Sequence, residues 1–263
     1  MIEVLDHGFV ELVDFMGSDY RILQAARVST GGTGKTTDEK DKLLIDYLYR
    51  NRHSSPFEKV IFEFHVKCPI FVVRQWFRHR TWSYNEYSAR YSPMIEDYYH
   101  PENFRKQGKT NHQGSGKDFD GILNMELQAR YASSHNKSKS TYEFLLEQGV
   151  AKEMARMVMP TSTYTEFYGT IDLWNLFHFL TLRTHEHAQF EIREFANAVF
   201  TLIKRMPEIK WSMAAFEENL KIDTVVQKLK NAFIDDSYES ENDEETGSLL
   251  LDKLYNILNG NDE

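Results

Sequence analysis

The chain has 263 residues, of which 41% are hydrophobic, and a formal net charge of −9 at pH 7. This apolar content is enough to bury a substantial core, whereas the negative charge argues against a protein that coats nucleic acid by neutralising phosphates. The sequence has no run of roughly 18–20 apolar residues and no basic flank before an apolar run, so we expect neither a membrane span nor a signal peptide, but a cytoplasmic protein.

The first 57 residues predict strands, two helices and a turn. Residues 2–15 alternate loosely between apolar and polar side chains, which indicates one or two strands. Helices are predicted over residues 20–28 and 38–50, the second from its amphipathic spacing. A Gly/Thr-rich loop at 29–37 separates these helices, and residues 53–57 predict a turn.

Residues 62–68 are the clearest strand, because their apolar side chains share one face, namely Phe62, Phe64, Val66 and Cys68. Pro69 suits the first turn of a following helix, where its missing N–H is not needed. One arc of that helix is polar, with Arg74, Gln75, Arg78 and His79. A cationic face is therefore expected directly after an apolar strand.

The second half is mostly helical. After a polar loop at 101–118, helices are predicted over 119–148, 152–159, 173–183, 188–205 and 211–220, and a strand over 162–170. Asp172 is placed to cap the helix at 173–183, which we expect to be buried because nearly every face is apolar. From about Ile234 the chain is acidic and predicted to be disordered, although residues 249–258 are amphipathic.

These elements predict an α+β fold with mixed helices around a small antiparallel sheet. We expect a single compact domain over residues 1–220, followed by an acidic, flexible tail over residues 221–263.

Residues 78–91, RHRTWSYNEYSARY, concentrate polar side chains without a helical or strand period. Arginine forks bind phosphates bidentately, and the interleaved Trp82, Tyr84 and Tyr87 offer flat apolar surfaces. The segment therefore favours a ligand with both rings and phosphates, and the alternative is a solvated charged loop.

Arg78-His79-Arg80, followed by seven residues and Ser88, resembles the R-H-R-x7-S signature of flavin-dependent thymidylate synthases. Four other segments resemble further blocks of that family in the same order: AARVS (25–29), HSSPFE (53–58), ARMVMP (155–160) and FHFLTLRTHEHAQFEIR (177–193). The resemblance covers roughly residues 1–215. It implies reductive methylation of dUMP to dTMP, with 5,10-methylenetetrahydrofolate as carbon donor and FAD, reduced by NADPH, as hydride carrier. It also implies a homotetramer whose sites lie between subunits.

The resemblance implies a role for each matching residue. The dUMP site, mostly around phosphate and sugar, would take Gln75, Arg78, Glu86, Ser88, Arg90 and Arg156. Arg183 would be catalytic, facing the uracil ring and favouring ionisation at N3. FAD would contact Ser55, Arg78, His79, Arg80 and Glu86, with Asp172, Leu173, Trp174 and His178 on its other side and His53 near its ring. Asp172 and Trp174 depart from the family pattern of Asn and Arg, and a carboxylate suits a helix cap better than a flavin diphosphate.

The residue chemistry agrees with a route that needs no thiolate. A cysteine attack at uracil C6 would need Cys68, the only cysteine, which the strand pattern places in the core. Arg183 ends an apolar helix, where a permanent charge needs a partner. That partner is either the ligand or a carboxylate such as Glu186.

Three rival interpretations remain. STGGTGKTT (29–37) resembles a phosphate-binding loop, but Ser29 replaces its leading glycine and a helix-like segment precedes it. His178, His185 and His187 suggest zinc, but the last two would face different ways on a helix, so we predict no metal. An RNA-binding module built on residues 78–91 is disfavoured by the acidic tail and the short basic patch, so we predict no nucleic-acid partner.

Overall fold

The computed structural model describes residues 1–29, 31–32, 36–108 and 115–237. The chain forms two compact units: the first comprises residues 1–35 and 54–209, and the second residues 36–53 and 210–263. The sequence had suggested one domain over residues 1–220, without the separate grouping of residues 36–53.

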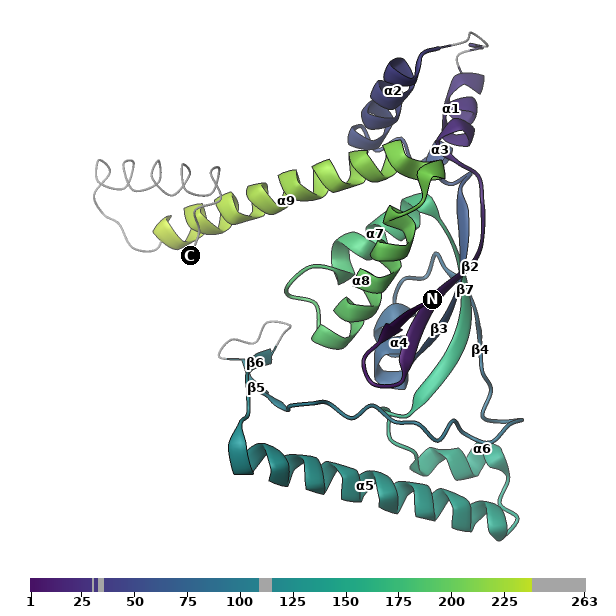
Figure 1. Cartoon of the computed structure of the whole chain (residues 1–263), viewed down its shortest axis with the longest axis vertical. Helices are drawn as coiled ribbons and strands as arrows, with labels where there is room; N and C mark the ends of the chain where they lie inside the picture. Colours follow the sequence, from purple (N-terminus) through teal and green to yellow (C-terminus); the bar gives the residue numbers. More distant parts are fainter. Residues whose placement is uncertain (30, 33–35, 109–114, 238–263) are drawn as a thin grey trace. The chain divides into compact units, whose positions relative to one another are not determined.

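The first unit is built on a five-stranded antiparallel sheet in the order β1-β2-β3-β7-β4 (Figure 1). Its strands are β1 (Ile2–Val4), β2 (Gly8–Met16), β3 (Ile61–Pro69), β4 (Ser83–Glu86) and β7 (Tyr164–Asp172). Its helices are α1 (Asp19–Val28), α3 (Ser54–Phe57), α4 (Ile70–Trp76), α5 (Gly121–Glu147), α6 (Lys152–Ala155), α7 (Leu173–Arg183) and α8 (Phe190–Lys204), with 3-10 turns η1 (Arg156–Val158) and η2 (Pro207–Ile209). The predicted mixture of helices around a small antiparallel sheet is confirmed.

One face of the sheet carries the core, and helices α4, α7 and α8 pack against it (Figure 1). On β3, the side chains of Phe62, Phe64, Val66 and Cys68 are 0% exposed, which confirms the predicted strand and its buried face. Trp76 of α4 is the centre of this core, with its ring 4.8 Å from Phe179 of α7 and 5.3 Å from Phe167 of β7. Burying each such aromatic side chain stabilises the fold by about 1.5–3 kcal/mol.

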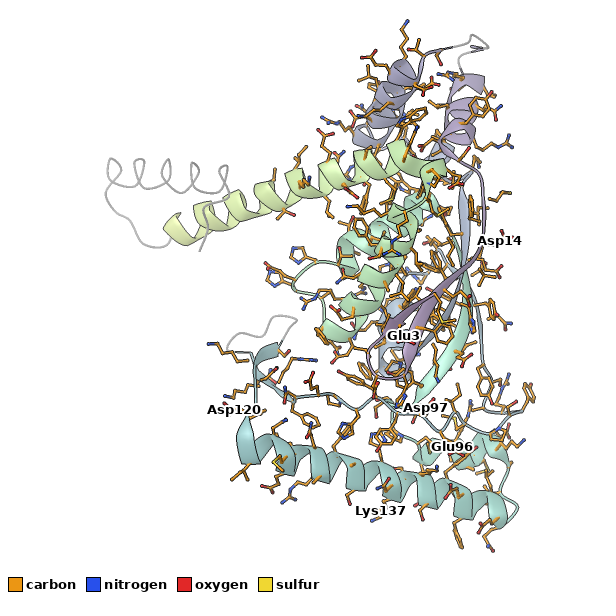
Figure 2. All side chains as sticks on the ribbon, viewed as in Figure 1. Glu3, Asp14, Glu96, Asp97, Asp120 and Lys137 are labelled. Carbon is orange, nitrogen blue, oxygen red and sulfur yellow. The ribbon has the colours of Figure 1, made fainter. Side chains whose placement is uncertain are left out.

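Many charged side chains lie outside this core. Glu3, Asp14, Asp120 and Lys137 are exposed, and Figure 2 labels them among the side chains of the described residues. No helix among the described residues is long and apolar enough to cross a bilayer.

Strand β4 forms inside residues 78–91. The sequence did not predict this strand, because the segment shows no strand period. β4 pairs with β7, with Ser83 opposite Thr170 and Glu86 opposite Phe167. Trp82 packs over Gly169, where an added Cβ would lie 3.0 Å from the indole ring. A tertiary partner and a glycine that admits the tryptophan, rather than a local alternation, therefore create this strand.

Helix α4 ends at Trp76, earlier than the sequence suggested. Pro69 is the residue before the first turn and does not lie in it. Arg78 and His79 follow the helix in a turn, in which the Arg78 amide donates to Gln75 O (3.3 Å) and the His79 amide to Trp76 O (3.0 Å). The predicted common arc for Arg78 and His79 is therefore wrong. The turn directs His79 inward, at 8% exposure.

Two predictions for the second half also change. Part of the loop at 101–118 is a two-stranded hairpin, β5 (Arg105–Gln107) with β6 (Ser115–Asp118), whose connection lies outside the described residues. The residues expected as a turn at 53–57 include the single helical turn of α3. Helices α1, α5, α7 and α8 match their predicted ranges within about two residues at each end, and Asp172 caps α7 as expected, accepting from the Asn175 amide at 3.0 Å. The helix predicted over 152–159 is α6 followed by the 3-10 turn η1, and the helix predicted over 211–220 continues to Ser237.

The second unit contains α2 (Asp38–Arg50), whose bounds are those predicted, and α9 (Lys210–Ser237). Tyr49 meets Phe216 edge to face at 6.3 Å, and Arg50 pairs with Glu218 at 2.9 Å. Helix α9 runs across residue 220, the expected domain boundary, and that boundary stays a prediction. The acidic segment beyond residue 237 and the amphipathic residues 249–258 lie outside the described residues.

Candidate active site

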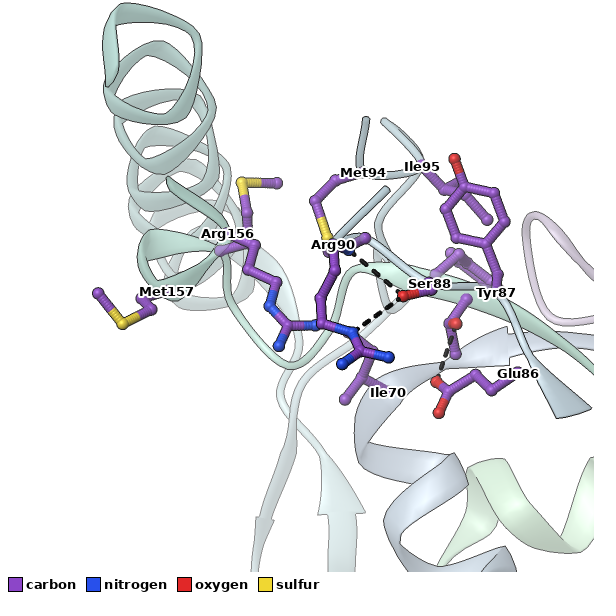
Figure 3. Close-up of a pocket in the computed structure, with 13 residues that line it drawn as sticks. Ile70, Glu86, Tyr87, Ser88, Arg90, Met94, Ile95, Arg156 and Met157 are labelled. Atoms are coloured by element: carbon purple, nitrogen blue, oxygen red, sulfur yellow. Dashed lines mark hydrogen bonds between the residues drawn. The ribbon is translucent and has the colours of Figure 1, made fainter. Parts of the chain in front are cut away.

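Two pockets in the first unit contain all seven residues expected to bind dUMP. The first, here called the Ser88 pocket, has a volume of 430 Å³ and lies at the end of β4 and the start of the chain that follows it (Figure 3). It is lined by Ile70, Glu86, Tyr87, Ser88, Ala89, Arg90, Met94, Ile95, Arg156, Met157, Met159, Tyr164 and Thr165.

The Ser88 pocket combines cations, a hydroxyl and apolar walls. Arg90 Nε donates to Ser88 Oγ at 3.4 Å, and Arg156 reaches the same pocket from η1 (Figure 3). Glu86 is the carboxylate in the lining, and it accepts from the Thr165 hydroxyl at 3.0 Å. Across the described part of the chain, neither arginine is ion-paired with a carboxylate, so both guanidinium groups remain available to an anionic ligand such as a phosphate.

The second pocket, here called the Arg183 pocket, has a volume of 620 Å³. It is lined by Arg74, Gln75, Arg78, Arg105, Ser115, Arg183 and Gln189. Four of these residues are arginines, contributed by α4, the turn after it, β5 and the end of α7. Such a cavity favours a ligand with negative charge.

Arg183 is held in this pocket by polar but uncharged groups. Its Nε donates to His79 Nε2 at 2.9 Å, and its Nη2 donates to the Gln75 carbonyl at 3.4 Å. Within the described residues Arg183 has no ion pair, so the alternative partner Glu186 is wrong. Burial lowers the pKa of Arg183 from its ordinary value. Because the two hydrogen bonds use only two of the five N–H donors of the guanidinium, the arginine keeps donors free for a ligand.

His79 accepts the Arg183 hydrogen bond because it is neutral. Burial first, then the charges of Arg183 and His178, lowers the pKa of His79 from 6.5 to about 4. A protonated imidazole has no acceptor nitrogen, and this geometry requires one. Nδ1 therefore carries the ring proton at neutral pH.

Cys68 lies in the core as predicted, at 0% exposure. Burial, and to a lesser extent the Glu86 carboxylate, raises the pKa of its thiol well above the ordinary value. A thiol in this position is neither accessible nor ionised near neutral pH, so it cannot act as a nucleophile.

The residues expected around a flavin occupy the turn after α4, α3 and the first turns of α7. Arg78 and Arg80 are exposed on either side of buried His79. Ser55 is exposed on α3, where neighbouring Phe57 lies 5.8 Å from the Trp174 ring. His178 is exposed on α7, with its ring 6.1 Å from His79, and Leu173 at the helix start is fully buried.

Two of these expected residues stand apart. Both carboxylate oxygens of Asp172 are engaged by Asn175, through the backbone amide at 3.0 Å and Nδ2 at 2.6 Å. His53 belongs to the second unit, where it stacks on Tyr47 at 6.0 Å, and its role near a flavin stays a prediction. The expectation that α7 is buried on nearly every face is wrong in part, since Leu182 is 48% exposed.

The rival interpretations gain no support. Helix α1 leads into residues 29–37, whereas a phosphate-binding loop needs a strand there; residues 30 and 33–35 themselves lie outside the described part. His185 and His187 follow α7 in a turn, not on a helix, with their rings 4.9 Å apart. Among the described residues, no group of three or more His, Cys, Asp or Glu side chains is arranged to hold a metal ion.

Sequence reasoning missed Arg105, Ser115 and Glu191 as parts of the site. Arg105 lies in a segment read as a loop, and it reaches the Arg183 pocket through an ion pair with Glu191, 86 residues away along the chain. No pattern in the local sequence predicts such a contact. Gln189 and Glu191 both lie within the segment 177–193 that resembles the family, but no role was predicted for either.

The chain matches known proteins over most of its length. Residues 11–208 match the family described as "Thymidylate synthase complementing protein". The flavin-dependent thymidylate synthase of Thermus thermophilus is 55% identical over 219 residues, covering 83% of this chain and 79% of that protein. That of Wolbachia pipientis is 44% identical over 254 residues, covering 96% and 82%. The structure of a UMP/dUMP methylase, PolB, from Streptomyces cacaoi bound with 5-Br dUMP superimposes with a TM-score of 0.72 at 36% identity, covering 82% of this chain and 97% of that one.

Proposed function

The chain belongs to the flavin-dependent thymidylate synthase family, and from this premise we propose that it is a cytoplasmic enzyme that converts dUMP to dTMP. The carbon comes from 5,10-methylenetetrahydrofolate and the hydride from FAD that NADPH has reduced. The observation that carries the proposal is the Arg183 pocket, in which a guanidinium with free donors lies among other arginines. It suits a ring that becomes negatively charged and that is attached to a phosphate.

The residues assigned to dUMP divide between two pockets, which supports a site completed by a second copy of the chain. Glu86, Ser88, Arg90 and Arg156 line the Ser88 pocket. Gln75, Arg78 and Arg183 line the Arg183 pocket, and the two linings share no residue. We therefore propose that the Ser88 pocket of one subunit meets the Arg183 pocket of another in a homotetramer.

The residues around the turn at 78–80 fit a flavin dinucleotide. Arg78 and Arg80 present two exposed guanidinium groups, the donors that a diphosphate requires. When bound, FAD supplies the hydride transfer that no side chain can perform. We propose that Ser55, His79, Glu86, Trp174 and His178 complete its surroundings. Asp172 is assigned to capping α7, because its oxygens are already hydrogen-bonded.

The chain's own residues would position dUMP and stabilise charge. Arg90, Ser88 and Arg156 hold the phosphate. Arg183, oriented by neutral His79, faces the uracil and stabilises the negative charge that develops in the ring, including that from ionisation at N3. Cys68 has no part, since its thiol is buried on the core face of β3.

Two measurements test this function. The purified protein is expected to show the visible absorbance of oxidised flavin, and to release tritium from C5-tritiated dUMP only with the folate donor and NADPH present. A colourless protein that FAD does not reconstitute would contradict the flavin assignment. Tritium release without NADPH or another reductant would contradict the hydride route.

A further inference from the structure

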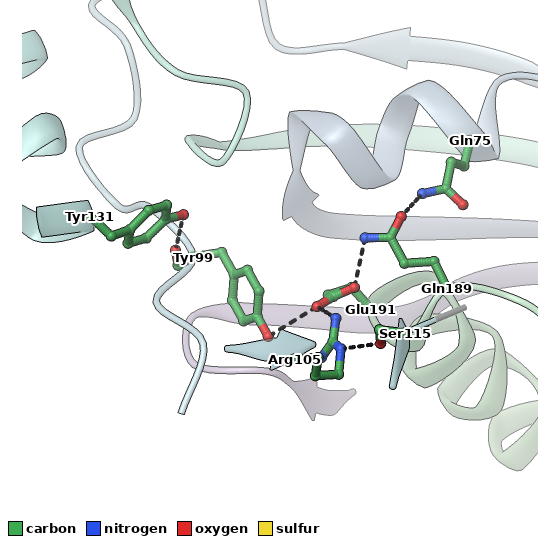
Figure 4. Close-up of polar contacts among 7 residues, drawn as sticks. All are labelled: Gln75, Tyr99, Arg105, Ser115, Tyr131, Gln189 and Glu191. Atoms are coloured by element: carbon green, nitrogen blue, oxygen red, sulfur yellow. Dashed lines mark hydrogen bonds and ion pairs between the residues drawn. The ribbon is translucent and has the colours of Figure 1, made fainter. Parts of the chain in front are cut away.

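Glu191 at the start of α8 is a buried carboxylate that the proposed reaction leaves unused. It is only 2% exposed. It accepts three hydrogen bonds, from the Tyr99 hydroxyl (3.3 Å), Arg105 Nη2 (2.5 Å) and Gln189 Nε2 (2.8 Å) (Figure 4). An ionised carboxylate is an acceptor only, so each neighbour must present a donor to it.

The need for a donor opposite Glu191 fixes the orientation of the Gln189 amide and, through it, that of the Gln75 amide. Because Gln189 directs its NH₂ group at Glu191, its carbonyl oxygen is left to accept from Gln75 Nε2 at 2.5 Å (Figure 4). Gln75 must then direct its own NH₂ group at Gln189. No described residue donates a hydrogen bond to Gln75 Oε1, and Gln75 lines the Arg183 pocket.

We propose that Glu191 is a positioning residue: through Gln189 it fixes the orientation of the Gln75 amide, so that the pocket offers an acceptor and selects a donor on the nucleotide. This inference rests on the proposed function, which places dUMP in the Arg183 pocket. With its phosphate ionised and N3 still protonated, dUMP has two donors, the ring N3–H and the 3′-hydroxyl. A phosphate oxygen is excluded from this position, because it would meet the amide oxygen acceptor to acceptor.

Fixing the amide matters because a free glutamine can rotate by half a turn. A free Gln75 would present either its oxygen or its NH₂ group, and would accept donors and acceptors alike. When the Gln75 amide is fixed, a ligand that presents an acceptor atom to Gln75 Oε1 cannot form a hydrogen bond there. Both acceptors then stay unpaired, and sites built on hydrogen bonds bind such a ligand much more weakly. The relay therefore acts on discrimination between ligands, more than on affinity in general.

The test compares the dissociation constants of three ligands for the full-length protein with FAD bound: dUMP, dCMP, whose N3 is an acceptor, and the dUMP analogue without the 3′-hydroxyl. Two variants interrupt the relay. In Glu191→Gln the amide can donate as well as accept, and in Gln189→Met the link to Gln75 is lost while Glu191 keeps Arg105. Tyr99→Phe is the control, since it removes a hydrogen bond to the same carboxylate on the other side of the relay.

The wild type is expected to bind one of the two altered ligands at least about tenfold more weakly than dUMP. Both relay variants should lose that discrimination, and the double variant should lose no more than either single one. Tyr99→Phe should keep the wild-type ratios. The ligand whose ratio changes identifies the donor that Gln75 accepts.

Wild-type ratios for both ligands in the relay variants would overturn the inference. If Glu191→Gln fails to fold, Gln189→Met decides alone. A wild type that does not bind dUMP at all would instead overturn the proposed function, so the two failures are distinguishable.

Discussion

Arg183 and His79 lie 104 residues apart in the chain, and a hydrogen bond of 2.9 Å joins Arg183 Nε to His79 Nε2. A second bond joins Arg183 Nη2 to the Gln75 carbonyl at 3.4 Å, and neither acceptor is charged. The neutral imidazole thus orients the cation without neutralising it, and a carboxylate partner would have cancelled the charge. The roles of Arg183 and His79 can therefore each be tested by substitution.

Arg183→Ala should lower the rate of dTMP formation by at least about 100-fold, because it removes the positive charge next to the developing anion. Flavin absorbance and oligomeric state should be unchanged. Arg130→Ala is the matched control, since Arg130 is exposed on α5 with Glu126 as its partner. Full activity in Arg183→Ala would show that the charge is not needed.

Acidification should destabilise the protein through His79. Its pKa is about 4 in the folded state and 6.5 ordinarily. Between these values the unfolded chain binds a proton that the folded chain does not, so stability rises with pH in this window and falls as the pH drops from 6.5 towards 4. Thermal unfolding should show a flatter pH dependence in His79→Gln than in the wild type. If the unfolding temperature had the same pH dependence in both proteins, His79 would be excluded as the cause of the acid destabilisation.

Asp172→Ala should reduce the free energy of unfolding by about 1 kcal/mol, since it removes the cap of α7. Asp172→Asn retains an acceptor oxygen and should lose less. Both variants should keep the wild-type flavin content per subunit. Loss of flavin from Asp172→Ala at unchanged folding would return Asp172 to the cofactor site.

Cys68→Ala should retain wild-type dTMP formation, because the thiol is buried and protonated. The loss of a small apolar side chain should lower stability by about 1 kcal/mol. In the native wild type, a thiol reagent should react with Cys68 only after denaturant is added. Inactivity of a folded Cys68→Ala would mean that the thiol takes part in the reaction.

Mixing two inactive variants should restore activity if each site takes one pocket from each of two subunits. Arg90→Ala damages the Ser88 pocket and Arg183→Ala the Arg183 pocket. After dissociation and random reassembly, about a quarter of the sites combine two intact halves. Recovery of about that fraction of wild-type activity is expected. No recovery, with mixed oligomers demonstrated, would place both pockets of each site on one chain.

Local patterns predicted the elements that depend on neighbours in the sequence. The alternation of Phe62, Phe64 and Val66 placed β3, and the position of Asp172 before an apolar run placed the start of α7. The same alternation put Cys68 in the core. These features need only a residue period or a cap, which a few consecutive residues specify.

The sequence by itself thus determined most of the helices, the central strand, the buried thiol and, through its motifs, the family. Only the tertiary structure decided that β4 pairs with β7, that His79 turns inward to Arg183, and that Glu191 reaches Gln75 through Gln189. Each of these joins segments far apart in the chain. These contacts depend on how the sheet and helices pack around Trp76. The residue pattern within one segment does not identify the distant segment that it will contact.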